Sequence, residues 1–392
     1  MEKWSLVKVC DLGQVITGKT PKTSIQENYG GNIPFLTPSD DMSVKYVLFT
    51  KKTLTDRGMT EVKNALLPKN SVCVSCIGSD LGKVVITSET TVTNQQINSI
   101  IVDKERFDVH FVYYAMLILG KELNFIGKTS TAVPIVNKSS FSSYEIMCPS
   151  LATQQRISSI LSAIDSKIEC NQRINNNLYE MVNAYFASLF RNAESEMTTI
   201  GNYSQRIYSG GTPSTSDAAY WGGTFGWLSS GETRNRFVTS TEKTITQSGV
   251  DNSATKLALK YDIVMASAGQ GFTRGQTSML LLDTYVNQSI IVIHAERKIL
   301  PYLFWNLANR YEELRAISDS SSIRGSLTTK MISALEIPKA GDDSLQVFSD
   351  FAWSIIPQIE NTLLENKRLI ALRDILLPKL MSGVIDVSDV RL

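Results

Sequence analysis

The chain has 392 residues, of which 43% are hydrophobic, and its 39 lysines and arginines nearly balance its 38 aspartates and glutamates. This length predicts two or three domains. No apolar run approaches the ~18–20 residues that cross a bilayer, so a membrane-spanning helix is excluded. The balanced charge excludes a strongly basic protein, so any contact with nucleic acid would depend on local positive patches.

Residues 13–20 (GQVITGKT) match the GxxxxGK[ST] pattern of phosphate-binding loops letter for letter. In such a loop a helix begins at once, so that its backbone N–H groups surround the phosphates. Here Pro21 follows directly, and the next residues show no helical period. We therefore interpret the motif as a turn that exposes Lys19 and Thr20, and a nucleotide-binding enzyme is the less favoured alternative.

The next elements are short: residues 71–77 and 97–102 predict strands, and residues 109–119 predict a helix. Cys73 and Cys76 lie in the first strand, where side chains three positions apart point to opposite faces. Core packing is therefore favoured over a zinc or redox site. The five scattered cysteines, and an N-terminus without the features of a secretory signal, predict a cytoplasmic protein.

Residues 151–190 contain neither Gly nor Pro, and apolar or Asn residues recur at alternating steps of four and three. This heptad pattern predicts a helix that packs along another helix, and at ~1.5 Å per residue it would be roughly 60 Å long. The pattern returns less regularly in residues 342–381, where Pro357 predicts a kink or a restart. The seam residues singled out are Ile157, Leu161, Ile164, Ile168, Asn175, Leu178, Val182, Ile355, Ile359, Asn366, Leu369 and Leu376.

Asn175 and Asn366 occupy equivalent places in the two seams. A polar Asn in a coiled-coil seam fixes the register of the two helices at some cost in stability. Alternatively the seam drifts, and both side chains face solvent. The sequence leaves the two interpretations open.

The chain contains an internal duplication. Residues 18–21 (GKTP) return as 210–213 (GGTP), 192 positions later, and Glu145-Ile146 returns as Glu336-Ile337, 191 positions later. A nearly constant offset indicates tandem duplication. We therefore predict an α+β fold with two pseudo-repeated α/β domains, separated by two long helices that pack as an antiparallel coiled coil. The second copy is expected to repeat the strands at 262–266 and 289–293 and the helix at 301–310. The predicted segments are domains 1–150 and 199–341, helices 151–191 and 342–381, and a tail 382–392.

Several segments resemble one known family, the specificity subunits of type I restriction-modification systems. Residues 148–157 (CPSLATQQRI) and 161–168 (LSAIDSKI) are similar to its central conserved region, and residues 365–383 (ENKRLIALRDILLPKLMSG) resemble its distal conserved region. Residues 78–83 (GSDLGK) resemble a strand-turn element of its target-recognition domains. The second copy departs there, because residues 269–275 (GQGFTRG) are longer and keep only the outline.

The resemblance implies a non-catalytic subunit of a DNA-modifying complex. In this family each target-recognition domain reads one half of a split, non-palindromic site in double-stranded DNA, and the helices set the gap between the halves. Two modification subunits dock on the helical region and carry S-adenosylmethionine and the chemistry, and restriction subunits join through the complex. We therefore expect no cofactor on this chain.

The residues themselves indicate no catalytic centre and no metal site. The only two histidines, His110 and His294, are far apart in the sequence. No spaced acidic cluster resembles a nuclease site, and no Asn-Pro-Pro-aromatic run or Gly-rich methyl-donor loop is present. The main alternative is a scaffold that joins other proteins through two α+β modules on a coiled coil.

The candidate DNA contacts are polar side chains, mostly in Gly-, Ser- and Thr-rich loops. Lys and Arg can reach phosphates or guanine edges, and Gln can read adenine, but each of these side chains could instead be an ordinary solvated surface group. They are Lys19, Thr20, Lys22, Ser79, Lys83, Lys128 and Lys138 in the first domain, and Thr212, Arg234, Arg236, Gln270, Arg274 and Arg324 in the second. Asn94-Gln95 and Asn287-Gln288 recur in both copies, so we expect these four residues to belong to a shared scaffold.

Overall fold

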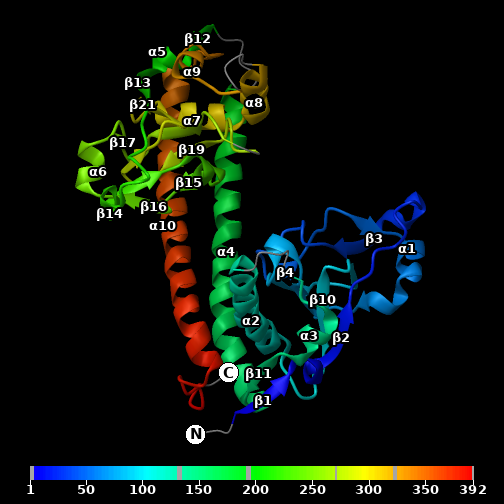
Figure 1. Ribbon diagram of the computed structural model, residues 1–392. Helices are drawn as coiled ribbons and strands as arrows, with labels where there is room; N and C mark the ends of the chain where they lie inside the picture. Colours follow the sequence, from blue (N-terminus) through cyan, green and yellow to red (C-terminus); the bar gives the residue numbers. More distant parts are fainter. Residues whose placement is uncertain (1–3, 130–134, 191–195, 270–271, 321–324, 391–392) are drawn as a thin grey trace. The chain divides into compact units, whose positions relative to one another are not determined.

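The computed structural model describes residues 4–129, 135–190, 196–269, 272–320 and 325–390 (Figure 1). The chain forms two compact units: unit 1 is Met1–Lys167 with Leu369–Leu392, and unit 2 is Ile168–Arg368. The two longest helices, α4 (Leu151–Phe190) and α10 (Asp342–Met381), each contribute one part to each unit. This division differs from the predicted segments, in which the helices stand apart from the domains, because each half-helix packs into the core of a domain.

Unit 1 contains two main sheets and one strand pair. The five-stranded sheet has the order β2 (Gly13–Thr17), β10 (Ile97–Val102), β7 (Val72–Ser75), β8 (Val84–Thr87) and β4 (Tyr46–Val47). The four-stranded sheet has the order β5 (Thr53–Leu54), β3 (Tyr29–Leu36), β9 (Thr91–Thr93) and β6 (Leu66–Leu67), and β1 (Ser5–Lys8) pairs with β11 (Glu145–Cys148). The helices are α1 (Asp56–Glu61), α2 (Val109–Thr129) and α3 (Lys138–Ser143).

Unit 2 repeats this arrangement strand for strand. Its five-stranded sheet has the order β13 (Ser204–Ser209), β21 (Ile290–Ala295), β18 (Ile263–Ala266), β19 (Thr277–Leu280) and β15 (Phe237–Val238). Its four-stranded sheet has the order β16 (Lys243–Ile245), β14 (Trp221–Leu228), β20 (Thr284–Val286) and β17 (Lys256–Ala258), and β12 (Met197–Thr199) pairs with β22 (Glu336–Pro338). Its helices are α5 (Ile200–Tyr203), α6 (Gln247–Asp251), α7 (Leu300–Ala308), α8 (Tyr311–Ser320) and α9 (Thr329–Ser333). The predicted α+β duplication is confirmed.

The core of unit 1 explains the two cysteines of β7. Cys73 packs between the two sheets, and Cys76 packs in the other core, with α2. Both are buried, so the prediction of core packing is confirmed. Burial raises the pKa of the Cys73 thiol to about 12, despite a hydrogen bond from Ser99. The thiolate that a metal or a redox reaction needs is therefore disfavoured.

Two helices differ from their predicted form. Helix α2 continues ten residues beyond the predicted end at Leu119, because Gly120 lets the helix approach the Gly82 turn, where a Cβ atom would lie 2.1 Å from the Gly82 carbonyl oxygen. Helix α10 runs through Pro357 without interruption, so the expected restart is wrong. Pro357 has no N–H group to donate to the Trp353 carbonyl four residues earlier. Because Pro357 is exposed, water can donate to this carbonyl instead.

Candidate nucleic-acid interface and helix pair

Two loops with the same internal frame occur in the two domains, at residues 37–52 and 229–243. In the first, the buried carboxylate of Asp40 accepts backbone N–H groups from both ends of the loop, at 2.7 Å each. In the second, the buried carboxylate of Glu232 does the same at 2.9 and 2.8 Å. The frame therefore depends on one buried acid in each copy and leaves the exposed positions free to differ.

A second repeated contact joins the segment after β2 to the turn before β10, and in unit 2 the segment after β13 to the turn before β21. Thr20 donates a hydrogen bond to Gln95 at 2.6 Å, and Thr212 donates one to Gln288 at 2.5 Å. Both threonines were candidates for DNA contact, but their hydroxyl protons are used within the domain. The expectation that Gln95 and Gln288 are scaffold residues agrees with these bonds.

The exposed side chains on the repeated loop frame differ between the copies. The loop of unit 1 presents Leu48 and Phe49, which are 66% and 88% exposed. The loop of unit 2 presents Arg234 and Ser240. Leu48 and Phe49 were not among the predicted contacts, although an apolar pair shortly before two lysines (residues 48–52, LFTKK) is a recognisable signal. Each copy therefore offers a different surface on the same support.

Five of the candidate cations are exposed and form no ion pair with a residue that the structure describes. They are Lys19, Lys22, Lys128, Lys138 and Arg234. Lys19 and Lys22 share the loop between β2 and β3, whereas Lys128 lies in the last turn of α2 and Lys138 begins α3. These groups are available to bind phosphates.

Three other candidate cations are engaged inside their own unit. Lys83 pairs with Asp80 at 2.6 Å. Arg274 pairs with Asp319 at 2.7 Å and donates to the Gly325 carbonyl. The guanidinium of Arg236 lies 4.1 Å from the ring centroid of Tyr179 on α4. These contacts hold loops and helices in place. Gln270, Arg324 and the side chain of Ser79 lie outside the described residues.

The phosphate-loop match lacks the structure that it requires. Residues 13–17 form strand β2, and the next element is a single 3-10 turn at Gln26–Asn28. No helix begins at Lys19 or Thr20, so their backbone N–H groups do not stand at a helix N-terminus. Lys19 is exposed and Thr20 half-buried in a segment that is neither helix nor strand, which agrees with a surface loop and not with a phosphate loop.

Polar residues pair across α4 and α10 within unit 2. The Asn171 amide donates to Asn366 at 2.9 Å, and Thr362 donates to Asn175. Thr362 is the equivalent of Asn171 in the second copy, and Asn366 is the equivalent of Asn175, each 191 positions later. The duplication therefore relates the two contacts to each other. They show that the helices run antiparallel. Asn175 and Asn366 are 9% and 6% exposed, which excludes the solvent-facing alternative.

None of the twelve predicted seam residues is exposed. Ile157, Leu161, Ile168, Asn175, Val182, Ile355, Ile359 and Asn366 are buried. Ile164, Leu178, Leu369 and Leu376 are half-buried. Asn171 lies in the same predicted heptad pattern, but its pairing with Asn366 was not predicted, because the partner of a seam residue depends on the register of the two helices.

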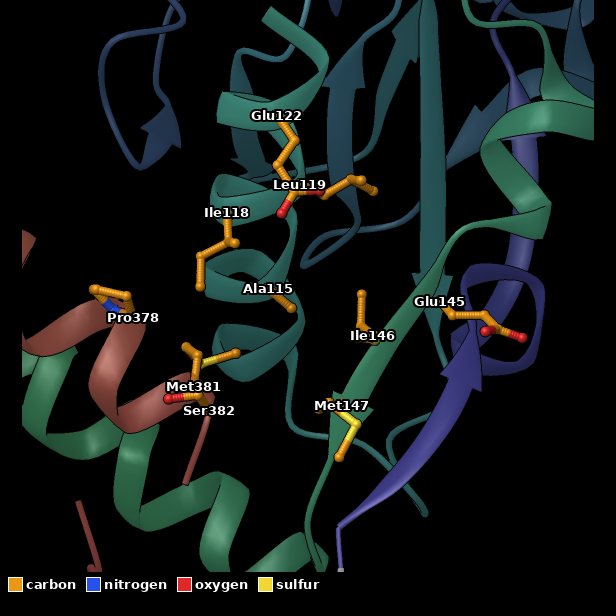
Figure 2. Close-up of a pocket in the computed structure, with 10 residues that line it drawn as sticks. All are labelled: Ala115, Ile118, Leu119, Glu122, Glu145, Ile146, Met147, Pro378, Met381 and Ser382. Atoms are coloured by element: carbon orange, nitrogen blue, oxygen red, sulfur yellow. The ribbon is translucent and has the colours of Figure 1, made fainter. Parts of the chain in front are cut away.

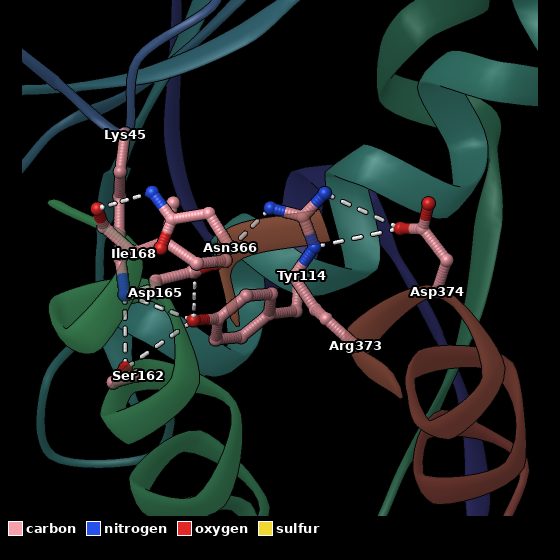
Figure 3. Close-up of polar contacts among 8 residues, drawn as sticks. All are labelled: Lys45, Tyr114, Ser162, Asp165, Ile168, Asn366, Arg373 and Asp374. Carbon is pink, nitrogen blue, oxygen red and sulfur yellow. Dashed lines mark hydrogen bonds and ion pairs between the residues drawn. The ribbon is translucent and has the colours of Figure 1, made fainter. Parts of the chain in front are cut away.

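Within unit 1 the carboxylate of Asp165 on α4 connects three other elements (Figure 3). It accepts a hydrogen bond from the Tyr114 hydroxyl of α2 at 2.5 Å and one from Arg373 of α10 at 3.2 Å, and the Lys45 ammonium lies 4.0 Å away. Burial and the neighbouring Asp165 charge raise the pKa of Tyr114 well above its ordinary value, so the hydroxyl keeps its proton and donates. Asp165 therefore anchors the domain to both helices.

We expect Asp165→Asn to lower the free energy of unfolding of unit 1 by about 1–3 kcal/mol, because Lys45 and Arg373 lose their carboxylate while only partly reaching solvent. The urea dependence of hydrogen exchange in α2 measures this loss. Tyr114→Phe is the control, since it keeps the carboxylate and removes only a neutral hydroxyl that contacts Asp165, Lys45 and Ser162, and it should cost about 1–2 kcal/mol. Equal exchange in the Asp165 variant and the wild type would contradict the anchoring role.

The two histidines form no joint centre. His110 lies in the first turn of α2, and His294 lies in β21 with its Nδ1 atom 2.6 Å from Asp262 Oδ1. Among the described residues, no group of three or more His, Cys, Asp or Glu side chains could hold a metal ion. The helices that the structure describes include none that is long and apolar enough to cross a membrane.

Comparisons with known proteins agree with the fold and with the resemblance. Residues 1–180 match the family model of the type I restriction modification DNA specificity domain. The chain is 38% identical over 149 residues to the type I restriction enzyme HindI specificity subunit of Haemophilus influenzae, covering 38% of this chain and 32% of that one. It is 30% identical over 183 residues to the MjaIX specificity subunit of Methanocaldococcus jannaschii, covering 46% and 41%. The matches thus span less than half the length of these relatives.

The fold is similar to the crystal structure of a type I restriction-modification S subunit from M. genitalium. The TM-score is 0.60 at 16% identity, and the similarity covers 97% of this chain and 96% of that one. The first part of the chain is thus similar in sequence to type I DNA specificity domains, and the duplicated fold as a whole is similar to that of this S subunit.

Proposed function

We propose that this chain gives a type I restriction-modification complex its DNA sequence specificity, with each domain reading one half of a bipartite target. The observation that carries the proposal is the loop frame that recurs with different exposed side chains, at residues 37–52 and 229–243. Two readers on one scaffold with different surfaces suit a site whose halves differ. Two linked readers also fix the spacing between half-sites.

The exposed cations would position the domains on DNA. Lys19, Lys22, Lys128 and Lys138 would neutralise phosphates, which contributes affinity without sequence information. Arg234 has the geometry to bond a guanine edge, and the apolar pair Leu48 and Phe49 could contact a thymine methyl group or wedge between base steps. Sequence information would then come mainly from the two framed loops.

The remaining parts of the proposal concern the complex. The helices α4 and α10 would set the gap between the half-sites and receive two modification subunits, and restriction subunits would join through the complex. S-adenosylmethionine would be held by the modification subunits. Exposed apolar side chains of α10, at Ile370, Leu372 and Ile375, support a protein contact on this helix.

Reconstitution tests this function. We expect the purified chain alone to show no methyltransferase, nuclease or ATP-hydrolysing activity, because no catalytic constellation was found in its sequence. With its modification subunit and S-adenosylmethionine, it should direct methylation to one bipartite sequence, and mapping of methylated bases gives the site. The Lys19→Ala variant should retain this activity, with weaker DNA binding at high salt. ATP hydrolysis by the purified chain that Lys19→Ala abolishes would contradict the proposal. If the modification subunit methylates the same sequences with and without this chain, the chain would instead be a scaffold.

A further inference from the structure

Unit 1 contains a pocket of about 280 Å³ between α2, β11 and the C-terminal end of α10 (Figure 2). We call it the α2–β11 pocket. Its apolar lining includes Ile118, Ile146 and Met381, one from each of these elements. Glu122 lines it from α2 and Glu145 from β11, and Figure 2 shows the Glu145 side chain directed away from α2. The pocket therefore combines apolar surface with the carboxylate of Glu122 and the backbone of Glu145.

The duplication shows what occupies the same place in unit 2. Helices α2 and α7 begin 191 positions apart, at Val109 and Leu300. Strands β11 and β22 also begin 191 positions apart, at Glu145 and Glu336. At this offset Leu119 corresponds to Arg310, and Glu122 corresponds to Glu313. The second copy thus has an arginine where the first has a leucine.

Arg310 satisfies the polar groups of this place in unit 2. Its Nε and Nη2 atoms donate to the two carboxylate oxygens of Glu313 at 2.7 and 2.6 Å, and its Nη1 atom donates to the backbone carbonyl of Glu336 at 2.8 Å. These bonds from Arg310 lower the pKa of Glu313. A bidentate arginine–carboxylate pair with a third bond to a strand carbonyl is a specific arrangement.

Unit 1 keeps the two acceptors but not the donor. Leu119 cannot form these bonds, and Glu122 forms no ion pair with any described residue. The Val9 N–H donates to the Tyr144 carbonyl at 2.8 Å. Along two antiparallel strands, residue pairs that exchange backbone hydrogen bonds alternate with pairs that do not. The next pair, Glu145 with Lys8, therefore exchanges no backbone hydrogen bond. The Glu145 carbonyl is therefore directed away from β1, as that of Glu336 must be to accept from Arg310.

We propose that the α2–β11 pocket binds an arginine side chain of a protein partner, which would supply in trans the contacts that Arg310 makes within unit 2. The guanidinium would pair with the Glu122 carboxylate and bond the Glu145 carbonyl, while apolar residues beside the arginine cover Ile118, Ile146 and Met381. A lysine would lack the planar, bidentate geometry, and Glu122 would repel a nucleic-acid phosphate. Only unit 1 lacks the internal arginine, so one partner segment binds per chain. This inference goes beyond the proposed function and does not require it.

A blocked tripeptide, acetyl-Leu-Arg-Leu-amide, provides the probe, and the full chain with ¹³C-labelled methionine methyl groups provides the readout. Met147 and Met381 line the pocket, so their signals should shift and saturate with one peptide per chain. The same peptide with citrulline, a neutral isostere of arginine, should bind at least about tenfold more weakly. Equal shifts with both peptides, or none at millimolar peptide, would overturn the proposal.

Two variants locate the binding. Leu119→Arg places in unit 1 the arginine that unit 2 carries and should abolish the shifts, whereas Leu119→Met should keep them. Glu122→Gln, which alters only a surface carboxylate, should weaken the arginine peptide at least about fivefold and leave the citrulline peptide unchanged. Unchanged affinity in Glu122→Gln contradicts the proposal even if Leu119→Arg does not fold. Because no methylation is measured, either failure leaves the proposed function standing.

Discussion

Replacing residues 199–340 with the equivalent domain of a related chain is expected to change one half of the methylated DNA sequence completely and to leave the other half unchanged. The physical reason is that the two domains have separate cores, which share no residue. The graft must keep the aromatic contacts with α4. Trp305 stacks on Tyr179 of α4, and Tyr302 packs against Phe186 of α4, each with 5.8 Å between the ring centroids. A domain that retains them should seat on the same helix surface.

Mapping of methylated bases in cells that carry the modification subunit measures the exchange. The reciprocal replacement of residues 1–150 is the matched control and should change only the opposite half. The ungrafted chain with Trp305→Ala should lose activity, because truncation of a buried Trp costs about 3–5 kcal/mol. A change in both halves after a single replacement would mean that the domains read DNA jointly.

Lengthening both long helices by one heptad is expected to widen the gap between the half-sites by about three base pairs. Seven residues add ~10 Å at ~1.5 Å per residue, and DNA rises ~3.4 Å per base pair. Duplicating residues 164–170 in α4 and 367–373 in α10 keeps the pairing of Asn171 with Asn366 and supplies the same residues to the added stretch of seam. A whole heptad also keeps the apolar stripe facing its partner.

Two controls separate the effect of length from damage to the helices. A two-residue insertion at both places rotates the apolar stripe into water and should lower the free energy of unfolding and abolish methylation. A heptad in α4 alone, after Cys170, forces the partner helix to accommodate a mismatch and should reduce activity. An active paired variant that still methylates the original gap would reject the spacing role and leave the helices as a docking surface.

Features that depend on neighbours in the sequence were determined by the sequence alone. The strand Ile97–Val102 has its predicted bounds, and the helix predicted over 151–191 is described over Leu151–Phe190, because β-branched runs and heptad spacing are local patterns. The duplication was equally visible, since a constant offset needs no knowledge of the fold. The opposite facing of Cys73 and Cys76 followed from the alternation of side chains in a strand.

The partners of the polar side chains were decided only by the tertiary structure. Asn366 pairs with Asn171 because the antiparallel register shifts the seams by one turn. Arg274 forms an ion pair with Asp319, although nothing in its local sequence distinguishes it from the cations without an ion pair. Phe49 is exposed, although nothing in its local sequence distinguishes it from a core residue. Arg310 fills in unit 2 the place that stays open in unit 1. Hydrogen bonds and ion pairs form only between groups a few ångströms apart. Tertiary packing therefore decides which groups pair, and most of these partners lie far apart in the sequence.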